Sequence, residues 1–129
     1  MRPIRVFAVT RQDAEKAPEV VTCTFLVSGH YARVLLDSGA SHSFVSISFG
    51  IVMGKPSSVL PYMLSIASPL GDPVLVQTWY PWCEIFMGGR SFFVDLIPLP
   101  RTNFDVILGM DFLSNYHAVI DCLSKVVVF

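Results

Sequence analysis

The sequence predicts an all-β domain with one or two short helices, and three observations support this fold class. Strand-favouring valine and isoleucine number 17 and 8, whereas alanine supplies only 7 residues. Strand-sized apolar runs are separated by turn residues, most clearly at Ser28-Gly29-His30 and Gly88-Gly89. Only two stretches place apolar residues at helical spacing, and both are short.

The predicted strands follow the apolar runs in chain order. The turn at 28–30 joins the first two strands as a hairpin, and the glycine pair at 88–89 joins a later pair. The expected strands are Glu19–Val27, Tyr31–Leu36, Tyr62–Ser68, Val74–Tyr80, Trp82–Met87, Ser91–Leu96, Val106–Leu108, Ala118–Cys122 and Lys125–Phe129.

Two short helices are expected, at Ser43–Met53 and Met110–Tyr116. The first has apolar residues at roughly helical spacing and stops at Gly54-Lys55-Pro56. The second follows Gly109, and its apolar side chains can share one face.

Length and composition favour one domain with a partner. A chain of 129 residues can build a single core, and we place that domain at residues 19–129. Residues 1–18 are more polar and are interpreted as a leader or linker, although Ile4–Thr10 could add a strand. Apolar residues make up 53% of the chain and charged residues 15%. Because this apolar excess is larger than so small a core needs, we expect part of it to be buried against a partner chain.

Several functional classes are disfavoured by the composition. Disorder is excluded by the apolar content, and no run approaches the roughly 20 apolar residues of a membrane-spanning helix. A net charge of −1 without a basic stripe gives no footprint for nucleic acid. Cys23, Cys83 and Cys122 are odd in number and widely spaced, which fits reduced thiols in the cytoplasm. Neither a zinc-type Cys/His spacing nor a phosphate-binding glycine loop is present, so no metal or cofactor is expected.

One segment combines an apolar strand with an acid and small residues. Val34-Leu35-Leu36 runs into Asp37, and Ser38-Gly39-Ala40 follows at once. A carboxylate at the end of a buried strand is costly unless it is paired or hydrogen-bonded. The small residues allow a tight turn close to that carboxylate. Taken alone, an Asp-Ser-Gly segment is more often a place where the aspartate caps a helix or turn.

A second segment has a wholly apolar strand that ends at a glycine. Val106-Ile107-Leu108 precedes Gly109, and a short helix begins directly afterwards. Taken alone, this is a buried core strand with a glycine where two backbones pass closely.

In combination, these segments resemble a retropepsin-type aspartic protease, in particular the protease encoded in polyproteins of plant gypsy-type LTR retrotransposons. The resemblance covers about residues 19–129 and implies an acid-protease closed barrel with one half-site per subunit. The matching segments, in order, are Leu35–Val45, Ala67–Asp72, Asp105–Leu113 and Ala118–Cys122.

The resemblance assigns a role to each matching position. Asp37 takes the place of the catalytic aspartate, and Ser38, Gly39 and Ala40 support its loop. Three residues fall on the element that passes beneath the active-site loop: Ile107, Leu108 and Gly109. The substrate flap falls on Ile66, Ala67, Ser68, Pro69, Leu70 and Gly71, which lack the glycine-rich pattern of retroviral flaps.

A single Asp-Ser-Gly motif implies two chains. Aspartic-protease chemistry needs two carboxylates on one water, and this sequence has one such motif. The second carboxylate would come from Asp37 of another copy across a two-fold axis. The sequence therefore predicts a homodimeric aspartic endopeptidase that processes its own polyprotein, in the cytoplasm or within retroelement particles.

The sequence leaves two alternatives open. The terminal Lys125–Phe129 either joins an intersubunit sheet, as the termini of retroviral relatives do, or is the last strand of the monomer's own sheet. The alternative function is a domesticated retropepsin-like module that dimerises or binds peptides without cleaving them.

Overall fold

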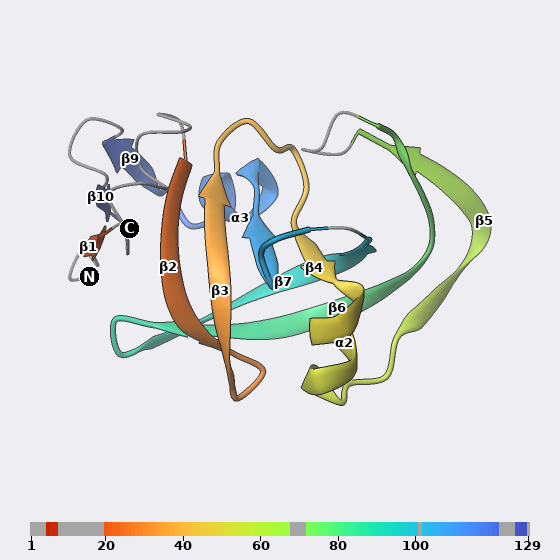
Figure 1. Ribbon diagram of the computed structural model, residues 1–129. Helices are drawn as coiled ribbons and strands as arrows, with labels where there is room; N and C mark the ends of the chain where they lie inside the picture. Colours follow the sequence, from red (N-terminus) through yellow and green to blue (C-terminus); the bar gives the residue numbers. More distant parts are fainter. Residues whose placement is uncertain (1–4, 8–19, 68–71, 101, 122–125, 129) are drawn as a thin grey trace.

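The first hairpin forms as predicted, with β2 (Val20–Val27) paired antiparallel to β3 (His30–Asp37). The computed structural model describes residues 5–7, 20–67, 72–100, 102–121 and 126–128. The other elements are β1 (Arg5–Phe7), β4 (Phe44–Ser46), α2 (Ile47–Met53), β5 (Ser58–Ile66), β6 (Val74–Met87), β7 (Arg90–Leu99), β8 (Val106–Leu108), α3 (Met110–Asn115), β9 (Val119–Asp121) and β10 (Val126–Val128) (Figure 1).

Seven strands form one sheet that closes on itself. Their order is β2-β3-β8-β4-β7-β6-β5, and β2 also pairs with β6. Figure 1 shows β6 and β7 crossing behind β2 and β3, so the sheet curls into a barrel. The all-β closed-barrel prediction is therefore confirmed, with two short helices among the described residues.

The short strand β8 lies in the sheet between β3 and β4. It runs parallel to β3, with Leu36 opposite Leu108, and antiparallel to β4. All three of its residues are buried. Because β8 is paired on both sides and buried, the residues at its end are fixed relative to the end of β3.

The predicted helix at Ser43–Met53 is wrong in its first part. Phe44–Ser46 is the buried strand β4, which pairs with β7 and β8. The helix α2 begins only after Ser46, whose hydroxyl accepts the N–H of Phe49 at 3.1 Å. Since sheet pairing needs partners distant in sequence, local spacing alone favoured helix over these three residues.

The predicted break at Pro81 does not occur. β6 runs unbroken from Val74 to Met87, and its pairing with β7 shifts register between Tyr80 and Cys83. This irregularity accommodates a proline, which has no N–H to give to the ladder. β5 begins at Ser58 rather than Tyr62 and ends at Ile66, before its predicted end. β7 is longer than predicted, whereas β8 has the predicted bounds.

The chain ends form a separate three-stranded sheet. Arg5–Phe7, part of the optional strand Ile4–Thr10, forms β1 and pairs with β10, which also pairs with β9. Both edges of β10 are thus occupied within one chain, as the monomer-sheet alternative expects. Most of residues 1–18 lie outside the described part, so the domain boundary at 18/19 stays a prediction. No helix in the described segments is long and apolar enough to cross a membrane.

Candidate active site

Asp37 ends β3 and begins a tight turn. The residue is buried, with 9% of its surface exposed. Its Oδ1 accepts the N–H of Gly39 at 2.8 Å, and its carbonyl oxygen accepts the N–H of Ala40 at 3.2 Å. A Cβ at Gly39 would lie 3.1 Å from the same Oδ1, tighter than ordinary contact. The turn therefore orients the carboxylate, and the absence of a side chain at 39 leaves room for it.

The loop after Asp37 is held by backbone bonds from the segment after β8. The N–H of Met110 donates to the carbonyl of Ala40 at 2.7 Å, and the N–H of Asp111 donates to the carbonyl of Ser41 at 3.3 Å. Ser38 and Gly39 are exposed at the tip, whereas Ala40 is buried. The loop thus presents its tip to solvent and fixes its base to α3.

A buried serine links the two segments a second time. Ser43 is fully buried, and its hydroxyl donates to Oδ1 of Asp111 at 2.6 Å while accepting the N–H of Gly109 at 3.0 Å. The same Oδ1 accepts the N–H of Phe112 at 2.8 Å. The pair could not be predicted from sequence: both residues lie in the segments that carry the family resemblance, but they are 68 positions apart and only the fold brings them together.

Gly109 lies directly against the loop. A Cβ built there would come within 2.2 Å of the carbonyl oxygen of His42 and 2.6 Å of that of Ala40. Both are backbone atoms, and the Ala40 carbonyl oxygen also accepts the N–H of Met110, so a side chain at 109 would force the backbone of the loop or of β8 to shift. Ile107 and Leu108 are buried beside the strand that carries Asp37. The structure thus brings all three residues of the predicted supporting element next to the aspartate loop.

The base of the predicted flap packs near the same loop. β5 and β6 pair up to Ile66 opposite Val74, and both side chains pack on the apolar cluster that contains Ala40 and Ile107. Ala67 is described, whereas Ser68, Pro69, Leu70 and Gly71 lie outside the described residues. The role of residues 66–71 as a flap stays a prediction.

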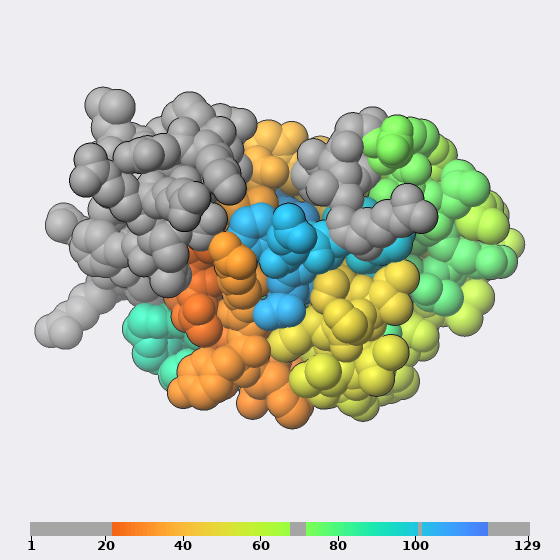
Figure 2. Space-filling model, in the orientation of Figure 1, coloured from red at the N-terminus to blue at the C-terminus, as the bar shows by residue number. Residues whose placement is uncertain are grey.

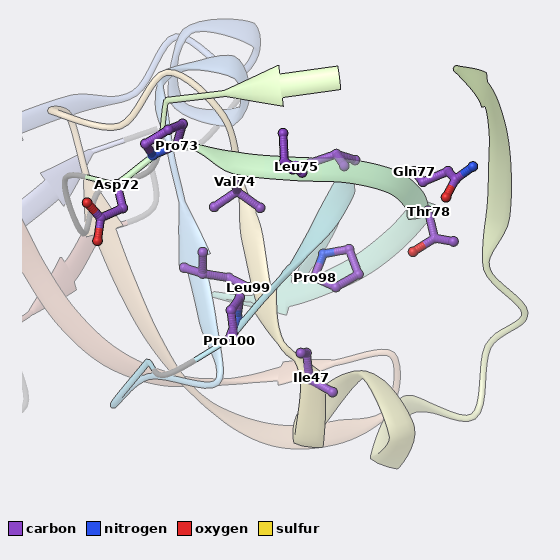
Figure 3. A pocket seen from close by; sticks show the side chains of 11 residues that line it. Ile47, Asp72, Pro73, Val74, Leu75, Gln77, Thr78, Pro98, Leu99 and Pro100 are labelled. Carbon is purple, nitrogen blue, oxygen red and sulfur yellow. The ribbon is translucent and has the colours of Figure 1, made fainter. Parts of the chain in front are cut away.

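A cavity of about 550 Å³ lies beside this hairpin and does not include Asp37 among its lining residues. Figure 3 shows that its walls come from β6, the end of β7 and the start of α2. Its lining is mostly apolar, and Asp72 is its one ionisable residue. The lining residues are Ile47, Asp72, Pro73, Val74, Leu75, Val76, Gln77, Thr78, Pro98, Leu99 and Pro100.

The helix α2 borders the cavity and carries apolar residues on the surface. Ile47, Ile51 and Val52 are each at least half exposed. In Figure 2 this helix, in yellow, lies on the surface beside the cyan-to-blue segment around residue 100. The sequence predicted neither this surface nor the cavity, because each combines elements that are distant along the chain.

Three other aspartates have local bonding roles. Oδ1 of Asp95 accepts the N–H of Trp82, and Oδ2 of Asp105 accepts the N–H of Arg33, each at 2.8 Å. Oδ1 of Asp111 accepts the hydroxyl of Ser43. Within the described residues, no group of three or more His, Cys, Asp or Glu side chains could hold a metal ion.

Two cysteines of the core, Cys23 and Cys83, have unreactive thiols near neutral pH. Burial raises the pKa of the Cys23 thiol to about 12 and that of Cys83 to about 11. Neither forms a disulfide. Because the thiolate is the reactive form, neither serves as a nucleophile near neutral pH.

The closed barrel, the clamped aspartate turn and the glycine beneath it together define a retropepsin-like fold. A model of the family described as retroviral aspartyl protease matches residues 2–129, and the chain belongs to that family. Among solved structures, the chain is similar to EIAV protease complexed with the inhibitor HBY-793. The two are 22% identical with a TM-score of 0.57, over 78% of this chain and 90% of that one.

A second similar structure is the retroviral protease-like domain of Ddi1 from Leishmania major. It is 17% identical, with a TM-score of 0.60 over 78% of this chain and 79% of that chain. At this level of identity, both likenesses concern the fold. A comparison with curated proteins gives no match.

Proposed function

We propose that this chain is an aspartic endopeptidase that works as a homodimer, with Asp37 of each copy acting on one shared water. The observation that carries the proposal is the buried Asp37 carboxylate, held in its turn by the Gly39 N–H. The loop is further fixed by Met110, Asp111 and Gly109. A site built this rigidly fits a catalyst that must keep two carboxylates in register.

The chemistry needs two carboxylates with different protonation. One deprotonates the attacking water, and the other, kept protonated, donates to the scissile carbonyl oxygen and later protonates the leaving nitrogen. Two carboxyls about 3 Å apart share one proton, because both cannot ionise together.

The second carboxylate is best supplied by another copy of the chain. Asp95, Asp105 and Asp111 each accept a local hydrogen bond at some other point of the fold. None stands on a turn like that of Asp37, and Asp37-Ser38-Gly39 occurs once in the sequence. Two copies related by a two-fold axis would bring two such turns together.

The substrate class follows from the family and from the apolar surroundings. We infer that the enzyme cleaves the polyprotein in which it is embedded, and that this polyprotein belongs to a gypsy-type LTR retrotransposon of the plant type. The half-buried Ile66, which packs beside the loop on the apolar cluster, favours apolar residues next to the scissile bond. The expected compartment is the cytoplasm or a retroelement particle.

The decisive variant is Asp37→Asn, which keeps an acceptor for the Gly39 N–H but cannot act as acid or base. We expect cleavage of an unstructured peptide library, assayed between about pH 4 and pH 7, to fall at least about a thousandfold. The matched control is Asp105→Asn, whose amide oxygen can still accept the Arg33 N–H. It should keep its activity.

Thermal unfolding and sedimentation of Asp37→Asn should match those of the wild-type chain. If Asp37→Asn cleaves as fast as the wild type, the assignment of Asp37 is wrong. If the wild-type chain forms a stable dimer but cleaves nothing across this pH range, the alternative of a silent dimerisation or peptide-binding module is favoured instead.

A further inference from the structure

The barrel has an outer sheet face that carries large apolar side chains. Strand pairing places Tyr31, Leu26 and Phe86 in one row across β3, β2 and β6. Tyr31 is 78% exposed and Phe86 is 42% exposed. Their neighbours Val27 and Ile85 point the other way and are fully buried in the core. One side of these strands is therefore buried in the core, and the side that carries the aromatic residues faces solvent.

Trp82, on the same face, is held in place by ring stacking and by backbone hydrogen bonds. It is 66% exposed, and its ring stacks on Phe93 with centroids 5.0 Å apart and planes 8° from parallel. Its φ of +55° lies in the left-handed region, which a bulky side chain rarely adopts. The N–H of Trp82 donates to Asp95, and its carbonyl accepts the ammonium of Lys55 at 2.8 Å. A strained backbone thus holds a flat aromatic pair towards solvent.

The charged groups around the aromatic pair are mainly acidic. Glu84 lies directly opposite Phe93 in the β6–β7 pairing, and Asp95 lies two residues further along β7. Among the described residues, Lys55 is a cation beside the pair, and its ammonium donates to the carbonyls of Pro81 and Trp82. Arg33 lies at the far edge of the face, over the ring of Phe104.

We propose that this face binds an extended, arginine-containing peptide segment. A guanidinium packs flat on the exposed indole of Trp82, where cation–π attraction and stacking act together. The carboxylates of Glu84 and Asp95 supply the complementary charge beside it. The site contains no part of the Asp37 loop, so it holds whether or not the chain is a protease.

The test uses a defined probe: an acetylated and amidated Gly-Arg-Gly-Arg-Gly peptide, titrated against the full chain. Binding is followed by the indole N–H signals in NMR spectra, with Trp79→Phe used to assign them. We expect saturable shifts of the Trp82 signal that weaken with added salt. The same peptide with glutamine in place of arginine should bind about tenfold more weakly or less, because it lacks the cation.

Trp82→Gly is the key variant, since glycine adopts the same positive φ without strain and leaves the backbone in place. It should keep or raise thermal stability while weakening the arginine peptide about tenfold, as measured by calorimetry. Trp82→Phe should restore most of the affinity. Tyr62→Ala, which removes a 58% exposed aromatic ring on β5, is the matched control and should bind normally.

Three outcomes would overturn the proposal: no saturable binding at millimolar peptide, equal affinity of the glutamine peptide, or unchanged binding by Trp82→Gly. A fourth outcome, loss of self-association in Trp82→Gly, would overturn it as well, because a second copy would then cover this face. Asp37→Asn should bind the peptide normally, which separates failure of this proposal from failure of the protease assignment.

Discussion

The buried carboxylate of Asp37 gains its geometry from residues without catalytic chemistry. Gly39 and Gly109 remove side chains where the turn and the neighbouring backbone meet, and Ser43 joins the two segments by its hydroxyl. The motif residues could be predicted, because small residues after a strand-terminal acid are visible in sequence. The partnership of Ser43 with Asp111 could not, because it depends on how two distant segments meet.

Gly109→Ala tests the close approach between Gly109 and the loop after Asp37, because it adds a single methyl group there. The new Cβ would lie 2.2 Å from the His42 carbonyl oxygen, so the loop or β8 must move. We expect a loss of more than about 2 kcal/mol in the free energy of unfolding, measured with urea, together with loss of cleavage.

The control for that prediction is Gly29→Ala, at a turn with φ +81° and open space around the missing Cβ. Because only backbone strain opposes this substitution, it should lower the free energy of unfolding by about 1 kcal/mol. Equal stability of the two variants would contradict the close contact between Gly109 and the loop.

At the scale of elements, the sequence predicts a strand or helix correctly where the signal lies within the segment itself. It predicts less well where pairing with a distant strand decides the secondary structure. The hairpin of β2 and β3 and the strand β8 follow from apolar runs and turn residues. By contrast, Phe44–Ser46 has helical spacing but forms β4, because β7 and β8 offer it two partners. Pro81 similarly marks a register shift within β6 rather than its end.

The paired strands β2 and β6 each bury one thiol, which reports whether these elements open. Burial raises the pKa of Cys23 to about 12 and of Cys83 to about 11, from 9.0 in each case. In a Cys122→Ser background, a thiol-specific reagent at about pH 8 should label the native chain only as fast as the strands open.

The raised pKa values also set the direction of a pH effect on stability. The folded state keeps both thiols protonated, so their contribution is fully present below about pH 9 and is lost as pH rises towards 11 and 12. The difference in stability between this background and a further Cys23→Ala, Cys83→Ala variant should therefore shrink with rising pH. Rapid native labelling at pH 8 would contradict the packing of these strands.

At the scale of the whole molecule, part of the apolar excess of the sequence lies on the surface of the barrel. The exposed apolar residues of α2 and the outer face at Trp82 are surfaces that one barrel does not cover. The terminal sheet keeps both edges of β10 inside one chain, which leaves β1 and β9 as its outer strands. The dimer remains a prediction that the single Asp37 motif requires, and which surface forms it is not encoded in any local pattern.

The measurement that most directly tests the central claim is a mixing experiment between wild-type chain and Asp37→Asn. The wild-type amount is held constant, inactive chain is added, and cleavage is measured after the subunits exchange. If one site needs Asp37 from two copies, activity should fall to about half at equal amounts and to about a quarter at a threefold excess. If activity stays constant at every ratio, each chain carries a complete site and the account is wrong.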